Sequence, residues 1–303
     1  MDKNKLIKKF KNYIVNELGY TTTTFKGYKT CINGYLDWLI TNQIQPKNMS
    51  LNQTYDFLAY RRLKGDTNGN IRTYKTVITH FNQAIEMKSN PALLVHLAKN
   101  ERKTPTQLLD EEFLDMIYRE TTSNTLVQKR DRCILGMMLF LGLSRNEVTT
   151  IQLEHLKLEE CRLYVSQSNT TNERYINLNP KQILHLSQYL YDVRPKLEQE
   201  YKINTNRLFF SCGDATGLDG ALARLMKRLK REFHYVKDFK QFKQSRMAIW
   251  VKELGLRQAQ YLGGYRYVTS VQRYDFKSID DLKMKLKYNH PMERFGLDFA
   301  IYN

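Results

Sequence analysis

The residue types that could do chemistry in this chain are a tyrosine and the cations around it, near the C-terminal end of the sequence. Tyr274 stands beside Arg273, follows the Gly263-Gly264 pair and lies nine positions after Tyr265. A tyrosine hydroxyl can open a phosphodiester once it loses its proton, although the reference pKa of the group is about 10. The five-coordinate phosphate then carries extra negative charge, which fixed cations must stabilise, and the departing 5′ oxygen needs a proton donor.

The run from Tyr261 to Tyr274 resembles the last catalytic box of the tyrosine recombinases, the phage-integrase family. In that box a Leu-Gly-His turn precedes, by the same nine residues, the tyrosine that attacks DNA. The resemblance implies that Tyr274 makes a covalent phosphotyrosine bond to a DNA strand, that Tyr265 replaces the histidine and that the adjacent Arg266 supplies charge. The other tyrosines of the run are competing nucleophiles. Only Tyr274 combines the spacing after Gly-Gly with the preceding Thr-Ser-Val-Gln-Arg pattern.

The first arginine of the family lies in a Gly-Leu-Arg-x-x-Glu box, which corresponds to Gly142 through Val148 in this chain. The glycine and the glutamate keep their spacing, so Ser144 occupies the arginine position. Arg145 lies one residue along, about 100° around a helix. We expect Arg145 to be a catalytic cation if the backbone at this point is not regular helix. The alternative is an arginine that lies in solvent or touches a phosphate.

The second arginine of the family lies in a His-x-x-Arg box that leads into a helix, and the best match begins at Lys240. Lys240 then stands for the histidine and Lys243 for the arginine, while Arg246 lies one turn from Lys243 on the same helix face. Lysine keeps the positive charge but loses the bidentate geometry that arginine offers to a phosphate. We expect these three residues either to stabilise transition-state charge or only to hold the DNA backbone.

The catalytic lysine of the family lies in a hairpin turn, about five residues before an arginine. Counting back from Arg174 leads to Asn169, and no lysine stands between Ser168 and Glu173. We therefore expect the turn to approach DNA through neutral donors such as Asn169, with Arg174 as a further DNA-binding residue.

Further basic residues gather in a predicted helix before the second-arginine box, in the first hundred residues and in a linker between the two regions. Such a run is often only a solvated helix face. Two basic domains joined by a basic linker, however, suit a clamp that closes around a duplex. The expected DNA-binding residues of this kind are Arg61, Arg62, Lys64, Lys99, Arg102, Lys103, Arg224, Lys227, Arg228, Lys230 and Arg231. Arg266 and Arg273 of the tyrosine box are expected to bind DNA as well.

The composition of the chain indicates a polyanionic partner. The 303 residues carry a formal net charge of +17, and the pI is near 9.6. Since the sequence has no long apolar run, nucleic acid is favoured over a membrane. Double-stranded DNA is the expected partner, and no cofactor is expected. The amphipathic start of the chain has no apolar signal core, so we expect a cytoplasmic protein.

The residue types that most often bind metals are scattered along the chain. Its four cysteines form no Cys-x-x-Cys pair, and its six histidines form no ligand pair at helical spacing. The sequence therefore predicts neither a zinc site nor a disulfide framework. The adjacent pairs Glu111-Glu112 and Glu159-Glu160 would diverge on a helix, so neither resembles a two-metal nuclease site.

The sequence predicts a mainly α protein with a small β-sheet, divided into two domains. Residues 1–103 form the expected helical DNA-binding domain, in which Leu6, Phe10 and Ile14 recur at helical spacing. A threonine-rich helix start before Tyr28 and a closing Asn-Pro-Ala sequence resemble the core-binding domain of the same family. The resemblance implies a clamp made of this domain and a catalytic domain.

Residues 104–303 form the expected α+β catalytic domain. Asp110 is placed to cap its first helix, and the stretches from Arg162 to Val165 and from Arg174 to Leu178 alternate like two strands of a hairpin. The tail from Phe295 to Tyr302 is apolar and aromatic. In the family a C-terminal element often docks on a neighbouring protomer, which would give a homo-oligomer on DNA. Docking on its own domain is the alternative.

The resemblance implies a protein that breaks and rejoins DNA strands through Tyr274, in site-specific recombination or in the processing of plasmid or other mobile DNA. Two alternatives stay open. One is an enzyme that nicks a single strand, like the recombinase-like relaxases of conjugative plasmids. The other is a degenerate recombinase that only binds DNA, as a replication, partition or transcription factor, because several family cations are replaced.

Overall fold

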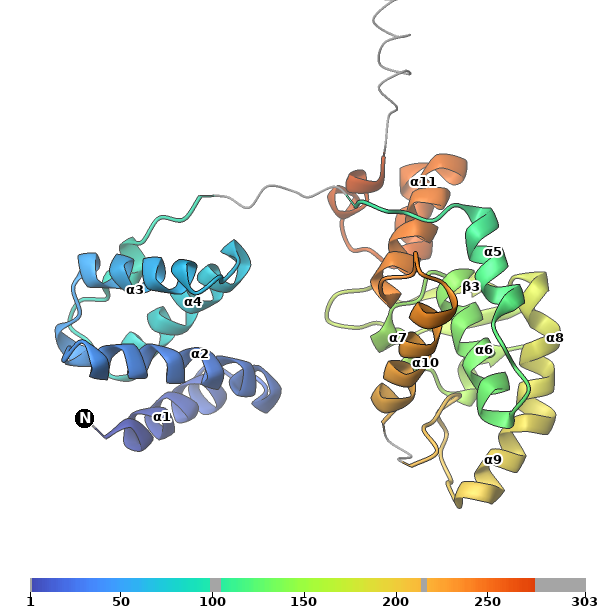
Figure 1. The fold of residues 1–303 in the computed structure, drawn as a ribbon, viewed down its shortest axis with the longest axis horizontal. Helices are drawn as coiled ribbons and strands as arrows, with labels where there is room; N and C mark the ends of the chain where they lie inside the picture. The colour runs from blue at the N-terminus through green and yellow to red at the C-terminus, as the bar shows by residue number, and fades with distance from the viewer. Residues whose placement is uncertain (1, 99–104, 214–216, 276–303) are drawn as a thin grey trace, which may run out of the picture. The chain divides into compact units, whose positions relative to one another are not determined.

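The structure of the chain, a computed structural model, describes residues 2–98, 105–213 and 217–275 (Figure 1). Inside these ranges helices predominate and one small sheet is present, which confirms the expected mainly α fold. No helix in the described part of the chain is long and apolar enough to cross a membrane. Contacts divide the chain into two compact units, Met1–Arg102 and Lys103–Asn303.

The first unit consists of helices that begin at capping side chains. Ser50 accepts a hydrogen bond from the Gln53 N–H, and the Gln53 side chain accepts one from the Ser50 N–H, so the predicted helix start at Ser50 is confirmed. The side chains of Asp2, Thr21 and Thr67 cap the other helices, and each accepts a single hydrogen bond from a backbone N–H. The helices are α1 (Lys3–Asn12), α2 (Thr22–Thr41), α3 (Leu51–Leu63) and α4 (Asn68–Ala84).

An aromatic core holds the first unit together. Phe10, Tyr35 and Phe57 are buried, and the ring centroids of Tyr35 and Phe57 lie 5.0 Å apart in an edge-to-face contact. Phe10 and Ile14 have no exposed surface. Their helical spacing therefore marks a buried face, which confirms the helix predicted at the start of the chain.

The second unit packs its helices around an antiparallel sheet of order β1-β2-β3. Tyr164 pairs with Tyr175 and Val165 pairs with Arg174, so the predicted hairpin is confirmed. β1 pairs with β2 but has only two residues, too few for alternation to reveal it. The elements are α5 (Glu111–Glu120), α6 (Leu126–Leu139), α7 (Arg145–Thr150), β1 (Leu156–Lys157), β2 (Arg162–Val165), β3 (Arg174–Asn177), α8 (Pro180–Gln188), α9 (Arg194–Tyr201), α10 (Asp219–Glu232) and α11 (Phe239–Gly263).

The buried helix α6 is the centre of the second unit. Every residue from Cys133 to Leu139 is buried, and the helix packs against α5, α8 and α11. Thr125 caps its start, and Asp110 caps α5 as predicted by accepting a hydrogen bond from the Phe113 N–H at 2.9 Å. Because α6 is fixed on all these sides, the turn that follows it holds α7 in one place.

Helix α11 carries Lys240 and Lys243 near its start, and Tyr265 and Tyr274 follow its end. Asp238 caps its start, which places Lys243 near the beginning of the helix. Gly255, with a φ of 81°, interrupts the regular helix, and Gly264 ends it with a φ of 70°, the left-handed conformation common at helix C-termini. A 3₁₀ turn, Gln272–Tyr274, then brings the chain back to α11.

Candidate active site

An open cavity of about 480 Å³ in the second unit collects most of the residues singled out from the sequence. Three segments meet there: the start of α7, the start of α11 and the chain that follows α11. Five of the six expected catalytic residues line the cavity, and Arg246 does not. The lining residues are Ser144, Arg145, Asn146, Asp238, Phe239, Lys240, Lys243, Gln244, Tyr265, Arg273 and Tyr274.

The carboxylate of Glu147 is buried beside this cavity and holds two cations. Its Oε1 lies 2.8 Å from Nη2 of Arg174, and its Oε2 lies 3.0 Å from Nζ of Lys243. Ser144 donates to the same carboxylate from its backbone N–H and from its hydroxyl, both at 2.7 Å. Burial would raise the pKa of Glu147, but Lys243, Arg174 and Ser144 together lower it to about 2. The carboxylate therefore stays ionised and fixes the position of the Lys243 ammonium group.

Arg174, expected from the sequence to bind DNA, belongs to this buried cluster instead. Its side chain has no exposed surface, and its Nε donates to the carbonyl oxygen of Leu262 at 2.8 Å. Gly264 lies so close that a side chain there would overlap the guanidinium. A charged residue in a short strand suggests an exposed position, because buried charges are rare unless they are paired. The partner, Glu147, is too distant in the sequence for a local pattern to reveal it.

Lys243 lies between the buried cluster and the cavity. Burial has the largest effect and lowers the pKa of its ammonium group, Glu147 opposes this shift and Arg174 adds to it. The Nζ atom also lies 5.6 Å from the ring centroid of Tyr265, within the range of a cation–π contact. The lysine thus presents a positive charge beside the tyrosines of the cavity.

The two tyrosines of the cavity contact each other. The hydroxyl oxygens of Tyr265 and Tyr274 are 3.2 Å apart, a hydrogen-bond distance. Tyr274 is 4% exposed, and the guanidinium of Arg273 lies 5.5 Å from the centroid of its ring. Burial raises the pKa of Tyr265, and the neighbouring Tyr274 raises it further. The expected nucleophile is therefore held in the cavity by the residue at the histidine position.

Arg145 is the first residue of α7 and lines the cavity. Ser144, just before it, is the helix N-cap and has an extended backbone with a ψ of 162°. The box is therefore not regular helix at this point, which is the condition that the sequence set for Arg145. The Arg145 side chain is 47% exposed and pairs with Asp219 at 2.8 Å. Such an exposed pair contributes little stability, so the guanidinium can exchange Asp219 for a phosphate.

Arg246 points into the body of the second unit and not into the cavity. Its Nε donates to the carbonyl oxygen of Leu139 at 2.7 Å, and its Nη1 donates to Glu111 at 2.6 Å. These contacts join α11 to α5 and α6. The position of Arg246 therefore fits a structural role and does not fit charge stabilisation at a phosphate. Lys240, in contrast, is exposed at the start of α11 and lines the cavity.

The turn between β2 and β3 is tied to the segment that follows α11. The Asn172 N–H donates to the carbonyl oxygen of Gly264, and Arg266 donates to the carbonyl oxygen of Ser168, both at 2.9 Å. Asn169 is exposed on this turn and does not line the cavity. The approach of Asn169 and Arg266 to DNA stays a prediction, but the structure links their turn directly to the tyrosine segment.

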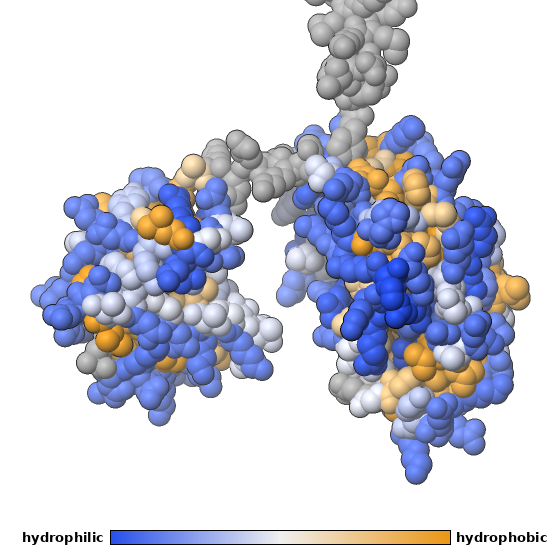
Figure 2. Space-filling view, viewed as in Figure 1, coloured by the Kyte–Doolittle hydropathy of each residue, from blue (hydrophilic) through white to orange (hydrophobic). Residues whose placement is uncertain are grey.

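Most of the remaining basic residues are exposed. Figure 2 shows the most hydrophilic side chains of the second unit gathered in the region of α10 and α11. Arg228 is an exception on α10, because it lies 3.6 Å from Asp131 and is largely buried. In the first unit, Arg61 pairs with Asp66 at 2.6 Å. The exposed members are Arg62, Lys64, Arg224, Lys227, Lys230 and Arg231, whereas Lys99, Arg102 and Lys103 lie outside the described residues.

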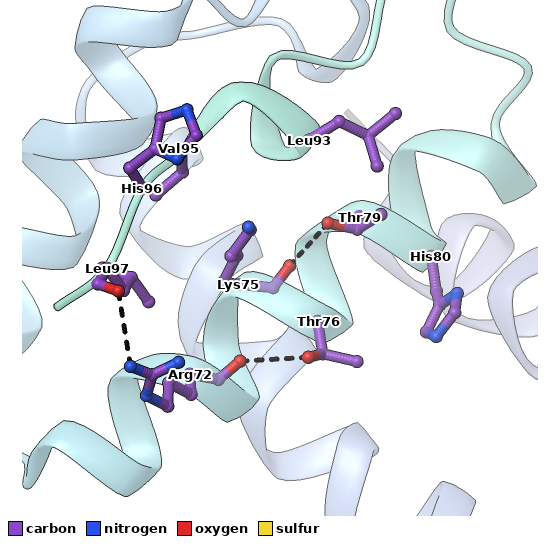
Figure 3. Close-up of a pocket in the computed structure, with 9 residues that line it drawn as sticks. All are labelled: Arg72, Lys75, Thr76, Thr79, His80, Leu93, Val95, His96 and Leu97. Atoms are coloured by element: carbon purple, nitrogen blue, oxygen red, sulfur yellow. Dashed lines mark hydrogen bonds between the residues drawn. The ribbon is translucent and has the colours of Figure 1, made fainter. Parts of the chain in front are cut away.

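The first unit contains a basic cavity that the motifs of the sequence do not single out. It has a volume of about 470 Å³ and lies between α4 and the segment that follows it (Figure 3). Its α4 residues recur at the i, i+3, i+4, i+7, i+8 spacing of one helix face. This periodic polar face is the sequence pattern from which the cavity could have been predicted. The lining residues are Arg72, Lys75, Thr76, Thr79 and His80 from α4, with Leu93, Val95, His96 and Leu97.

The described ranges contain no cluster of metal-binding side chains, and their cysteines form no disulfide. No group of three His, Cys, Asp or Glu side chains there could hold a metal ion. Each of the four cysteines is free. Burial raises the pKa of Cys133, so this thiol is an unreactive part of the core.

The chain is similar over nearly its whole length to curated tyrosine recombinases. It is 23% identical over 290 residues to tyrosine recombinase XerC of Anoxybacillus flavithermus, which covers 93% of this chain and 96% of that protein. It is 24% identical over 302 residues to tyrosine recombinase XerC of Bacillus pumilus, which covers 96% of this chain and 97% of that protein. No family model matches the chain.

Solved structures of recombinases and integrases share the fold of this chain. The XerH site-specific recombinase bound to difH substrate, in a pre-cleavage complex, has a TM-score of 0.70 at 15% identity and covers 94% of this chain and 84% of that chain. The Tn1549 transposon integrase in complex with transposon right end DNA has a TM-score of 0.64 at 15% identity and covers 94% of this chain and 99% of that chain.

Proposed function

We propose that this chain, which is a divergent member of the tyrosine recombinase family, breaks and rejoins DNA strands through a phosphotyrosine intermediate at Tyr274. One observation carries the proposal. Tyr274 shares a cavity with Lys243, Lys240 and Arg145, so a phenol and three cations face one space that a phosphate could enter.

The proposed cleavage step conserves atoms and charge. The hydroxyl oxygen of Tyr274 forms a bond to phosphorus, and the bond between phosphorus and the 5′ oxygen breaks with its electron pair. The phenol proton leaves to solvent through the open cavity, and Lys243 donates a proton to the departing 5′ oxygen. Rejoining reverses these steps with the 5′ hydroxyl of the same strand or of another one.

Lys243 is the residue best suited to donate that proton. Burial lowers its pKa, which brings the group closer to the operating pH, where a general acid is most effective. The contact with Glu147 keeps the ammonium group in place, and after donation the lysine regains a proton from solvent. Arg145 and Lys240 then stabilise the charge of the five-coordinate phosphate.

Duplex DNA is the proposed substrate. The net charge of +17 and the exposed cations of both units favour a phosphate backbone. Of the neighbours in structure, XerH is bound to its difH substrate, and the Tn1549 integrase is in complex with transposon DNA. These complexes support site-specific recombination or mobile-element processing, which we propose takes place in the cytoplasm. The relatives described above are recombinases and an integrase, so they lend no support to the relaxase alternative.

We also propose that residues 1–103 and 104–303 act as two domains that close on the duplex. Each of the two compact units has its own buried core, as independently folding domains do. Assembly of several copies on DNA through the C-terminal tail remains part of this proposal.

A substrate that traps the intermediate tests the proposal. Randomised duplexes with a nick beside each potential scissile phosphate lose the short 5′ product after cleavage, so the covalent complex accumulates. Native filter binding first selects the duplexes that the protein binds tightly. Denaturant-resistant complexes among these identify the cleavage site, and peptide mapping should place the DNA on Tyr274. A protein that binds a selected duplex tightly but forms no adduct would be the binding-only recombinase. An adduct on another tyrosine would refute Tyr274 as the nucleophile.

A further inference from the structure

We infer that Tyr265 is a positioning residue that donates a hydrogen bond to Tyr274 and so favours the phenolate form of the nucleophile. The inference deepens the proposed function and rests on it. The resemblance predicts only that a tyrosine replaces the histidine at this position. The distance of 3.2 Å between the two hydroxyl oxygens assigns this tyrosine a partner, which is the nucleophile itself.

Tyr265 is held rigidly from its backbone. Its N–H donates to the carbonyl oxygen of Gln260 at 3.0 Å, and its own carbonyl oxygen accepts from the Gln260 side chain at 3.0 Å. Thr171 of the hairpin turn forms an isolated β-bridge with Tyr265. The Cδ2 and Cε2 atoms of the ring lie so close to Gly263 that a side chain there would collide with them. The hydroxyl of Tyr265 is therefore a fixed point in the cavity.

Tyr274 reaches this fixed point from a short and well-packed segment. Its N–H donates to the carbonyl oxygen of Val271 at 2.9 Å, within the 3₁₀ turn Gln272–Tyr274. The ring belongs to a small apolar cluster that includes Met247 and Trp250 of α11. Since both rings are anchored, the contact between the hydroxyls does not depend on two mobile side chains meeting by chance.

The surroundings decide which hydroxyl donates. Burial raises the pKa of Tyr265 and the neighbouring Tyr274 raises it further, whereas Arg273 opposes these shifts. The cation of Arg273 lies over the ring of Tyr274. The raised pKa of Tyr265 and the cation over the ring of Tyr274 both favour Tyr265 as the donor in this contact. The other charged groups around the pair are Arg145, Asp238, Lys240 and Lys243 in the cavity wall and Glu147 behind Lys243.

A hydrogen bond to a phenolate is roughly twice as strong as one to a neutral phenol. The contact therefore stabilises ionised Tyr274 more than neutral Tyr274, and its loss makes ionisation harder. Tyr265 gives up no proton in this scheme. The proton of Tyr274 goes to solvent, and the bond that forms and the bond that breaks are those of the proposed cleavage step.

The first test needs no DNA and no activity. A fluorotyrosine is placed at position 274 by codon reassignment, and its fluorine NMR signal is followed through a pH titration of the full chain. We expect Tyr265→Phe to move the ionisation midpoint of this reporter to higher pH. The matched control is Tyr267→Phe, two residues away, which removes an exposed hydroxyl outside the cavity lining. Equal midpoints in wild type and Tyr265→Phe would overturn the inference.

The second test uses cleavage of the selected duplex. Below the midpoint of the pH profile, Tyr265→Phe should cleave about tenfold more slowly, and the deficit should shrink as pH rises. A residue with a merely structural part would lower the rate equally at every pH, and that result would also overturn the inference. If Tyr274→Phe still cleaves, the proposed function fails, whereas the NMR midpoints still decide the contact between the two tyrosines.

Discussion

The ammonium group of Lys243 lies 3.0 Å from the carboxylate of Glu147, and both side chains are largely withdrawn from water, at 12% and 5% exposure. The two residues come from different boxes of the sequence, at the starts of α7 and α11. Their contact joins two motifs: the one in which Ser144 occupies the position of the first arginine, and the one in which Lys243 occupies the position of the second. One carboxylate thereby orders the cation that faces the nucleophile.

Replacing Tyr274 by phenylalanine should abolish strand cleavage and leave DNA affinity within about threefold of wild type, because a lost DNA contact costs at most one hydrogen bond, on the order of 1 kcal/mol. The exchange removes one oxygen and keeps the ring in its apolar cluster. Cleavage of a nicked suicide duplex and a filter-binding titration measure the two quantities. Residual cleavage at the wild-type rate would show that Tyr274 is not the nucleophile.

Lys243→Ala should reduce the cleavage rate by roughly 100-fold, since one charge at the transition state is worth about 3 kcal/mol. If Lys243 also donates the proton, a duplex with sulfur in place of the bridging 5′ oxygen should recover most of the rate, because a thiolate leaves without a proton. The control is Lys252→Ala, an exposed lysine on the same helix. A loss of binding in proportion to the loss of cleavage would mean that Lys243 only holds the backbone.

Glu147→Gln should lower the free energy of unfolding by about 3 kcal/mol at neutral pH, because it leaves two buried cations without their anion. The pKa of Glu147 in the folded protein is about 2, below its ordinary value. The ionised carboxylate therefore stabilises the folded state fully at any pH above the ordinary pKa, and this stabilisation is lost as pH falls through about 2. The difference between wild type and variant should therefore shrink on acidification. Urea titrations at several pH values measure it, with the exposed Glu253→Gln as the control.

The basic cavity of the first unit should contribute to DNA binding through phosphates. If about six phosphates are contacted in all, log affinity should fall against log salt with a slope near −5, and each lost contact should reduce the slope by about 0.9. Arg72→Ala combined with Lys75→Ala should therefore give a visibly shallower slope. The charge-matched control combines Lys8→Ala with Lys11→Ala, both exposed on α1. An unchanged slope would remove the cavity from the DNA interface.

Protease cleavage between Ala98 and Gln107 should release two folded pieces. The two compact units bury separate cores, and the sequence between them is rich in polar and charged residues. Circular dichroism of the purified pieces should show cooperative melting of each. An unfolded first piece would contradict the division into two domains.

Local sequence patterns were sufficient to predict helices that begin at a capping residue and strands or helices whose apolar residues recur periodically. Ser50 and Asp110 could be recognised as helix caps because their hydrogen bonds close within three residues. The β2–β3 hairpin could be predicted because its strands alternate. Local patterns alone did not predict the fold as a whole. That prediction came from several weak motifs that occur in the same order along the chain as in the tyrosine recombinases.

The parts of the site that depend on contacts between distant segments could not be predicted. Arg174 was expected to bind DNA, because the local strand pattern does not reveal Glu147, its partner from another element. Arg246 was expected to act beside Lys243 because the two residues lie one helical turn apart. The packing of α11 against α5 and α6 instead directs the Arg246 side chain toward Glu111. The hydroxyl contact of Tyr265 depends on the path of the chain through two short turns, which has no sequence period.

The left-handed glycine that ends α11 limits how this protein can vary. At Gly264 the φ of 70° alone would admit asparagine, which tolerates that conformation better than most residues. The guanidinium of Arg174 already fills the space that a Cβ would need, so asparagine is excluded as well. At Gly255, with a φ of 81° and a ψ of 169°, the space is open and only the backbone demands glycine. A substitution at position 264 therefore requires a simultaneous change at Arg174. Loss of Arg174 would leave Glu147 without one of its cations, so these three positions must evolve together.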